Sequence, residues 1–245
     1  MSKIYEALQH AYKEKTVPEE RHSNVPASFK TAVQGPHLEM DEEMLGLYKS
    51  IDTLLPATPN KVIQFIGTSV GEGTSTIARA FARLSATRVG CSVLLLDADR
   101  HMSTQSLYFD VMSEQSWIEA LKKGDTFGNA VYQVGQSSLF VSPSCNSSVA
   151  TPEIFNSPRF ADFWGSLRQT YDLILVDCAP LAVSPDGLAL ASKVDGVVLV
   201  VEAEKTRWQT AKNLRESIQK VGGNVLGAVF NKRRFYIPQS VYKHL

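Results

Sequence analysis

The feature that most constrains the fold is a set of short segments built almost entirely from apolar residues, mainly Val, Ile and Leu. These segments lie at 61–67, 92–97, 138–141, 173–177, 196–202 and 225–230. Their apolar residues are consecutive rather than alternating, so both faces of each strand must be covered, as in a parallel sheet. Helical patterns lie between and around them, at 40–55, 74–88, 113–123, 157–170, 184–192 and 206–221. This alternation predicts an α/β fold, with a doubly wound and mostly parallel sheet and right-handed crossovers.

The two ends of the chain differ in character from this central part. Residues 1–14 have an amphipathic helical pattern, and residues 15–38 are polar, contain three prolines and show no period. We therefore predict an N-terminal helix at 1–14, a flexible linker at 15–38, an α/β domain at 39–231 and a basic, aromatic tail at 232–245. The first helix either packs on its own domain or docks on a partner. The tail either contacts an anionic bilayer or a partner, or is a solvated arm.

Composition excludes several functional classes. Lys plus Arg and Asp plus Glu both number 25, so the balanced charge gives no general attraction to nucleic acid or to an acidic membrane. Cys91, Cys145 and Cys178 form no CxxC pair, which argues against a zinc site and indicates free thiols in a reducing cytosol. No apolar stretch reaches the roughly 18 residues of a membrane span, and the N-terminus lacks a secretory signal. We expect a cytoplasmic protein that binds no nucleic acid and reaches the inner membrane only through a partner.

A glycine-rich loop follows the first of these strands directly and leads into a helix. It reads Gly-Thr-Ser-Val-Gly-Glu-Gly-Thr-Ser-Thr over residues 67–76. In such a loop, glycines let backbone N–H groups surround phosphate oxygens, and the helix N-terminus adds partial positive charge. A hydroxyl in the first helical turn binds Mg²⁺, and Ser75 holds that place. The pattern predicts a site for nucleotide phosphates, and the alternative is a glycine turn that binds no ligand. The residues of the predicted site are Gly71, Glu72, Gly73, Thr74, Ser75 and Thr76.

Thr74 stands where the strict phosphate-loop pattern has lysine. A charged hydrogen bond is worth about 1.5–3 kcal/mol, so its loss weakens nucleotide binding by about 10–100-fold. The effect on phosphoryl transfer should be larger, because the lysine neutralises charge that develops during the reaction. Arg79 and Arg83 lie on the following helix, at a reach that the sequence leaves open.

Acidic residues end two further apolar strands. Asp97 and Asp99 follow one strand, and Asp177 ends another. Parallel strands bring their carboxyl ends to one edge of the sheet, where ligands bind, so these carboxylates should gather beside the loop. There they can hold Mg²⁺ or accept a proton, which makes Asp97 and Asp99 catalytic candidates and Ser75, Asp97 and Asp177 metal candidates. Asn231 ends the last strand, and its amide either pairs with a purine base or forms a turn.

These motifs together resemble those of the bacterial tyrosine kinase family, the cytosolic kinase domains of polysaccharide co-polymerases, which are related to Min/Par-type P-loop ATPases. The resemblance covers residues 40–231 and rests on GEGTST at 71–76, LLLDADR at 94–100, YDLILVDCAP at 171–180, DGVVLVVE at 195–202 and LGAVFN at 226–231. It implies a P-loop NTPase fold that uses ATP with Mg²⁺, holds ATP or ADP, and works with an inner-membrane chain-length regulator. It makes residues 71–76 the Walker A loop and Asp177 the Walker B acid, and it places Asp97 near the metal and the attacking hydroxyl.

The sequence departs from the family pattern at three places. Thr74 replaces the Walker A lysine, and the tail offers Tyr236 and Tyr242 as phosphoacceptor candidates instead of a dense tyrosine cluster. The E-x-x-R-x-x-R motif that the family uses in ring contacts falls on Glu43, Gly46 and Lys49. The first departure argues against kinase activity. The other two argue against tail-controlled ring assembly and leave a homo-oligomer open.

Three functions are compatible with these features. We favour a nucleotide-binding regulator of exopolysaccharide synthesis or export, with weak or absent kinase activity, that docks on a membrane partner. An active ATP-dependent protein-tyrosine autokinase is the first alternative, and a Min/Par-type positioning ATPase is the second. The last fits least, because Thr68 and Ser69 occupy the region where those loops carry an extra lysine.

Overall fold

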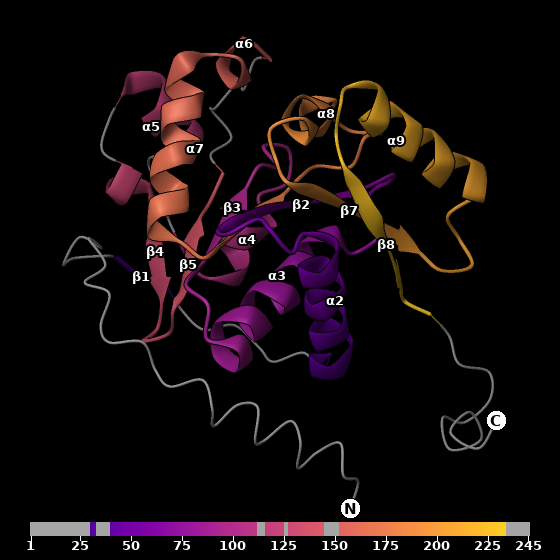
Figure 1. Ribbon diagram of the computed structural model, residues 1–245, viewed down its shortest axis with the longest axis horizontal. Helices are drawn as coiled ribbons and strands as arrows, with labels where there is room; N and C mark the ends of the chain where they lie inside the picture. The colour runs from indigo at the N-terminus through magenta and orange to yellow at the C-terminus, as the bar shows by residue number, and fades with distance from the viewer. Residues whose placement is uncertain (1–29, 33–39, 112–115, 125–126, 145–151, 234–245) are drawn as a thin grey trace, which may run out of the picture.

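The computed structural model describes residues 30–32, 40–111, 116–124, 127–144 and 152–233. Within these residues the chain forms one sheet of eight strands with helices on both faces (Figure 1). In spatial order the strands are β1 (Lys30–Ala32), β4 (Tyr132–Val134), β5 (Leu139–Ser142), β3 (Val93–Asp97), β6 (Leu173–Asp177), β2 (Lys61–Gly67), β7 (Gly196–Glu202) and β8 (Val225–Asn231). All neighbours are parallel except β4 and β5, so β1 and β4 run against the rest. The predicted α/β fold with a mostly parallel sheet is confirmed.

Each face of the sheet has its own helical layer and its own apolar cluster. α2 (Asp41–Leu54) and α3 (Thr74–Leu84) cover one face, where Ile51 and Phe81 pack against the central strands. The other face is covered by α5 (Trp117–Lys123), α6 (Pro152–Phe155), α7 (Pro158–Thr170), α8 (Asp186–Ala191) and α9 (Trp208–Lys220). The side chains of Trp117 in α5 and Trp164 in α7 are buried in the apolar cluster of this face. Strands β3 and β6 are therefore buried at every position, which is why their sequences are continuously apolar.

The structure adds elements that the sequence pattern does not predict. β2, β6 and β7 have the predicted bounds, but β1, β4 and the short helix α4 (Thr104–Tyr108) are additional. β1 lies within residues 15–38, the range of the predicted linker, and it pairs with β4. The helix predicted at 74–88 is α-helical only to Leu84 and continues as a π-helical turn, Ser85–Val89. The predicted helix at 1–14 lies outside the described residues.

Six parallel strands bring their carboxyl ends to the same edge of the sheet. These are β2, β3, β5, β6, β7 and β8, and in the register of β3 and β6 the Cα atoms of Asp97 and Asp177 are partners. Trp117 fixes this edge to the helical layer, because its buried indole Nε1 donates to Asp97 O at 2.8 Å. Among the helices of the described residues, none is long and apolar enough to cross a bilayer.

Candidate nucleotide site at the carboxyl edge of the sheet

The loop between β2 and α3 presents a row of unpaired backbone donors. Gly71 and Gly73 both have a φ of +90°, a left-handed conformation that glycine adopts without strain, and Gly73 is the N-cap of α3. Within the described part of the chain, no group accepts a hydrogen bond from the N–H groups of residues 71–76. Successive free N–H groups at the start of a helix form an anion-binding concavity. The loop therefore has the geometry that a phosphate group requires.

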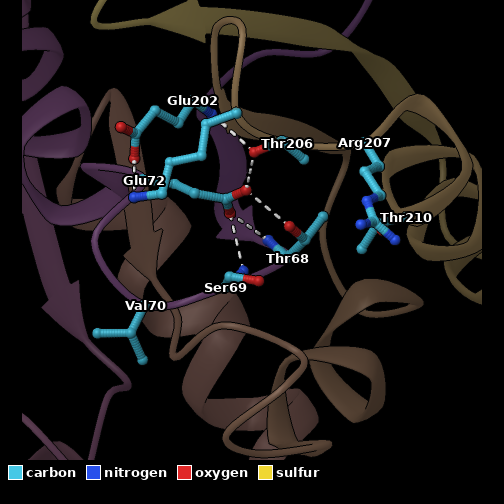
Figure 2. Close-up of a pocket in the computed structure, with 9 residues that line it drawn as sticks. Thr68, Ser69, Val70, Glu72, Glu202, Thr206, Arg207 and Thr210 are labelled. Atoms are coloured by element: carbon cyan, nitrogen blue, oxygen red, sulfur yellow. Dashed lines mark hydrogen bonds and ion pairs between the residues drawn. The ribbon is translucent and has the colours of Figure 1, made fainter.

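Glu72 anchors this loop to the connection between β7 and α9, as Figure 2 shows. The residue is 3% exposed, and its carboxylate accepts hydrogen bonds from Thr68 N, Thr68 Oγ1 and Ser69 N at 2.5, 2.6 and 2.9 Å. A fourth hydrogen bond comes from Thr206 Oγ1 at 2.5 Å. These groups line a cavity of about 240 Å³ that Arg207 also borders. The side chain of Glu72 is thus a structural part of the loop, and only its backbone N–H is left for a nucleotide.

Thr74, at the position of the Walker A lysine, is buried against the end of β2. A Cβ added to Gly67 would come within 2.8 Å of Thr74 Oγ1 and 2.7 Å of Glu72 Oε2, so this close approach requires glycine at the strand end. The short hydroxyl side chain can offer one neutral hydrogen bond and brings no positive charge to the loop.

Asp97 and Asp177 lie next to each other at the ends of β3 and β6, as the parallel arrangement predicts. Both residues are fully buried. Asp97 accepts hydrogen bonds from Asp99 N and Ser103 Oγ, each at 2.9 Å. Asp177 Oδ2 accepts one from Gln105 Nε2 at 2.7 Å, whereas Asp177 Oδ1 has no partner among the described residues. The pair therefore presents one buried carboxylate oxygen that accepts no hydrogen bond from the described residues.

Burial raises the pKa of both carboxyl groups. For Asp177, the loss of hydration raises the pKa from 3.8 to about 6, against the lowering effects of the Gln105 hydrogen bond, the nearby Ser75 hydroxyl and the charge of Arg79. For Asp97, burial and then the charge of Asp177 raise the pKa well above its ordinary value. Two adjacent buried carboxylates of this kind bind a proton or a cation more readily than they persist as two bare anions.

The residues at this edge fit a magnesium ion. Asp177 Oδ1 is available, and the Ser75 hydroxyl is close enough to lower the pKa of Asp177. In the described ranges, no group of three or more His, Cys, Asp or Glu side chains is placed to hold a metal ion. In nucleotide sites Mg²⁺ takes one or two carboxylates and completes its coordination with water and phosphate oxygens. Metal coordination by Ser75, Asp97 and Asp177 stays a prediction.

Asp99 makes contacts that shape the turn after β3. Its Oδ1 accepts hydrogen bonds from His101 N at 2.9 Å and Met102 N at 3.0 Å. The next residue, Arg100, forms an ion pair with Asp186 at the start of α8, with 2.8 Å between Nε and Oδ2. These contacts hold the turn in place beside Asp97, and a catalytic role for Asp99 stays a prediction.

Gln105 and Arg79 form a chain of contacts that the sequence does not predict. Gln105, in α4, is fully buried; its amide donates to Asp177 and accepts a hydrogen bond from Arg79 Nη1 at 3.3 Å. The Arg79 guanidinium lies over the ring of Tyr108, 4.3 Å from its centroid. Burial lowers the pKa of Arg79, and the charges of Asp177, Tyr108 and Asp97 act in the opposite direction. No periodicity marks Gln105, because its role depends on contacts made only after folding.

Asn231 approaches the loop from the end of β8. Its Nδ2 donates to Glu72 O at 2.8 Å, and its Oδ1 accepts from Lys232 N at 2.9 Å. A Cβ on Gly73 would collide with this Nδ2, so the amide also requires glycine at that position. Recognition of a purine by Asn231 stays a prediction. The phosphoacceptor candidates Tyr236 and Tyr242 lie outside the described residues.

A glycine loop between a strand and a helix, with acids at the ends of two neighbouring strands, defines the P-loop class of α/β proteins. Residues 60–216 match the family described as cellulose biosynthesis protein BcsQ. The match spans more than half of the 245 residues, and the chain belongs to this family.

One relative of the chain is named a tyrosine-protein kinase, and another is named a succinoglycan biosynthesis transport protein. The chain is 28% identical over 177 residues to the tyrosine-protein kinase CpsD of Streptococcus pneumoniae, covering 70% of this chain and 76% of CpsD. It is also 28% identical over 227 residues to the succinoglycan biosynthesis transport protein ExoP of Rhizobium meliloti (strain 1021), covering 89% of this chain and 27% of ExoP. The predicted resemblance to bacterial tyrosine kinases is confirmed.

Solved structures show the same fold. The chimerical protein CapA2B2 has a TM-score of 0.73 at 24% identity, covering 82% of this chain and 88% of that chain. The septum site-determining protein MinD from Pyrococcus horikoshii OT3, complexed with Mg-ADP, has a TM-score of 0.57 at 19% identity, covering 75% and 76%. The chain therefore shares its fold with both groups that the sequence motifs indicate.

Proposed function

We propose that the protein binds an adenine nucleotide with Mg²⁺ at the loop between β2 and α3, and so regulates polysaccharide synthesis or export. The observation that carries this proposal is the row of N–H groups at residues 71–76, which donate to no group of the described residues and lie beside Asp97 and Asp177. Phosphate oxygens satisfy such donors. Mg²⁺, when bound, supplies positive charge that offsets the charge of the phosphates.

The same site lacks what rapid phosphoryl transfer needs from the protein. Thr74 is neutral and buried, so the loop carries no charge that follows the transferred phosphoryl group. Arg79 does not replace the lysine, because its guanidinium is engaged with Gln105 and Tyr108. Charge that acts mainly in the transition state matters more for the rate than for binding. We infer that the nucleotide is held and that its transfer is weak or absent.

The polysaccharide role is supported by the description of the BcsQ family and by the name of ExoP. The matched segment is 27% of ExoP, so ExoP carries a long additional chain beside its P-loop domain. We propose an inner-membrane chain-length regulator as partner, with this protein at the cytoplasmic face of the membrane. Val70, in the loop, and Val183, after β6, are 60% and 38% exposed, and they offer apolar contacts for that partner at the edge that holds the nucleotide.

Two measurements on the purified protein test the proposal. Isothermal titration with MgADP and MgATP should give binding in the wild type and none in Ser75→Ala combined with Asp177→Ala, with an unchanged circular dichroism spectrum as the control for folding. Incubation with labelled ATP and Mg²⁺ should then give little protein labelling in the wild type and more in Thr74→Lys. Failure of the wild type to bind either nucleotide at millimolar concentration would remove the proposal.

An active tyrosine autokinase is the second candidate, because the relative CpsD is named a tyrosine-protein kinase. It predicts strong labelling of the wild-type protein at Tyr236 or Tyr242, abolished by Asp97→Ala and by Phe at both tyrosines. The same labelling experiment therefore separates the two functions.

A further inference from the structure

Residues 67–76 of the phosphate loop contain no lysine, but the side chain of a lysine from another part of the chain contacts this loop. Lys232 directly follows β8; its Nζ donates to Gly71 O at 2.5 Å and lies 3.4 Å from Glu202 Oε2. Its side chain is 48% exposed, so the ammonium lies at the rim of the loop and not beneath it. It is therefore next to the unpaired N–H groups of residues 71–76.

The backbone at Lys232 adopts a conformation that needs support. Its φ is +56°, in the left-handed region, which costs a residue with a Cβ free energy. The N–H of Lys232 donates to Asn231 Oδ1, while Asn231 Nδ2 donates to Glu72 O. Two successive side chains thus hold two successive carbonyl groups of the loop, those of Gly71 and Glu72. The strained backbone aims the lysine at the loop.

The other basic side chains near the site do not have this position. Lys205 also pairs with Glu202, at 3.1 Å, but it is 70% exposed, and within the described residues its ammonium makes no hydrogen bond to the loop. Arg79 lies on the side of Asp97 and Asp177 and is held by Gln105. Lys232 is thus the lysine of the described chain whose ammonium contacts the loop backbone.

We propose that Lys232 binds the nucleotide phosphates and stands in, from the end of β8, for the lysine that Thr74 replaces. The inference rests on the proposed function, because it names a residue of the same site. In the free protein the ammonium is held by Gly71 O and Glu202. When nucleotide occupies the concavity, the flexible four-carbon stem lets the ammonium exchange a carbonyl oxygen for a phosphate oxygen, and the charged contact is the stronger one.

The position of Lys232 also distinguishes it from the lysine it replaces. A Walker A lysine is part of the loop and reaches the terminal phosphates. Lys232 approaches from the strand that carries Asn231, on the side of the loop away from Asp177 and the predicted metal ligands. It therefore contributes charge to holding the nucleotide more than to transferring a phosphoryl group, which agrees with binding that persists without rapid transfer.

Isothermal titration with MgADP tests the proposal in six proteins. These are the wild type, Lys232→Gln, Lys232→Arg, the matched control Lys205→Gln, Thr74→Lys and the double variant Thr74→Lys/Lys232→Gln. We expect Lys232→Gln to weaken binding about 10-fold, since a half-exposed charged hydrogen bond is lost. Lys232→Arg should retain most of the affinity, and Lys205→Gln should lie within about twofold of the wild type. With Thr74→Lys present, the loss at Lys232→Gln should fall below about threefold, because the loop has its own ammonium.

Each result decides whether Lys232 binds the nucleotide phosphates. An unchanged dissociation constant for Lys232→Gln overturns the proposal while leaving the proposed function standing. If Lys232→Gln lowers the affinity for MgADP equally in the wild type and in Thr74→Lys, Lys232 only holds the loop in place. This result also overturns the proposal. If the wild type binds no MgADP, the proposed function and this inference fall together. Urea midpoints of all six proteins exclude a loss of folding as the cause of weaker binding.

Discussion

Replacing Asp177 with asparagine should stabilise the nucleotide-free protein, although it should also remove metal-dependent binding. The pKa of Asp177 rises from 3.8 to about 6 because the carboxyl group is completely buried. A shift of about two units corresponds to about 3 kcal/mol by which the ionised form disfavours the folded state. The amide keeps an oxygen that accepts the hydrogen bond of Gln105 and carries no charge.

The sign of the effect gives a pH dependence. Because the folded-state pKa is raised, the folded protein binds the proton more tightly than the unfolded chain, so the penalty is absent below pH 3.8 and complete above pH 6. Urea unfolding without Mg²⁺ or nucleotide should therefore show Asp177→Asn to be more stable by less than about 1 kcal/mol at pH 4 and by about 3 kcal/mol at pH 8. Asp162→Asn, at an exposed position of α7, serves as the control and should have little effect at either pH. A gain that is equal at both pH values, or no gain at pH 8, would refute the account of a buried charge.

Three further variants test other parts of the structure. Gly73→Ala must place a Cβ at a φ of +90° against the side-chain amide at the end of β8, so it should weaken MgADP binding at least about 10-fold in calorimetry. Asp195→Ala removes both hydrogen bonds of the bidentate pair with Arg168 and an acceptor for a backbone N–H of β2. We expect a loss of about 2–4 kcal/mol in urea unfolding, and a loss below 1 kcal/mol would mean that the pair behaves as an ordinary surface ion pair. Gln105→Leu removes the donor that lowers the pKa of Asp177, so Mg²⁺-dependent nucleotide binding should shift to higher pH, which titrations between pH 5 and 8 would detect.

The central strands could be predicted from the sequence because their burial leaves a direct signal. β6 is buried at all five positions, and its predicted bounds are those of the structure. β4 has only three residues and α4 only five, lengths at which neither period 2 nor period 3.6 can be recognised. β1 also has only three residues and lies in a polar segment, so no apolar run in the sequence indicates that it pairs with β4.

The candidate site likewise contains some features that the sequence predicts and others that it does not. The adjacency of Asp97 and Asp177 follows from parallel strands that end in acids, and the structure pairs the two residues. The roles of Glu72 and Gln105 were not visible, because they depend on tertiary contacts. The hydroxyl that reaches Glu72 is 134 residues away in the chain, and no local rule connects the two positions.

The hydrogen bond between Glu72 and Thr206 has a mechanical consequence. It ties the phosphate loop to the segment just before α9, so a shift of Glu72 away from the sheet must either move that segment or break a partly buried hydrogen bond. Trp208 lies two residues beyond Thr206 and is 65% exposed, which places an indole on the surface of the tethered helix. A movement of Glu72 on nucleotide binding would therefore reach α9, where the fluorescence of Trp208 would report it.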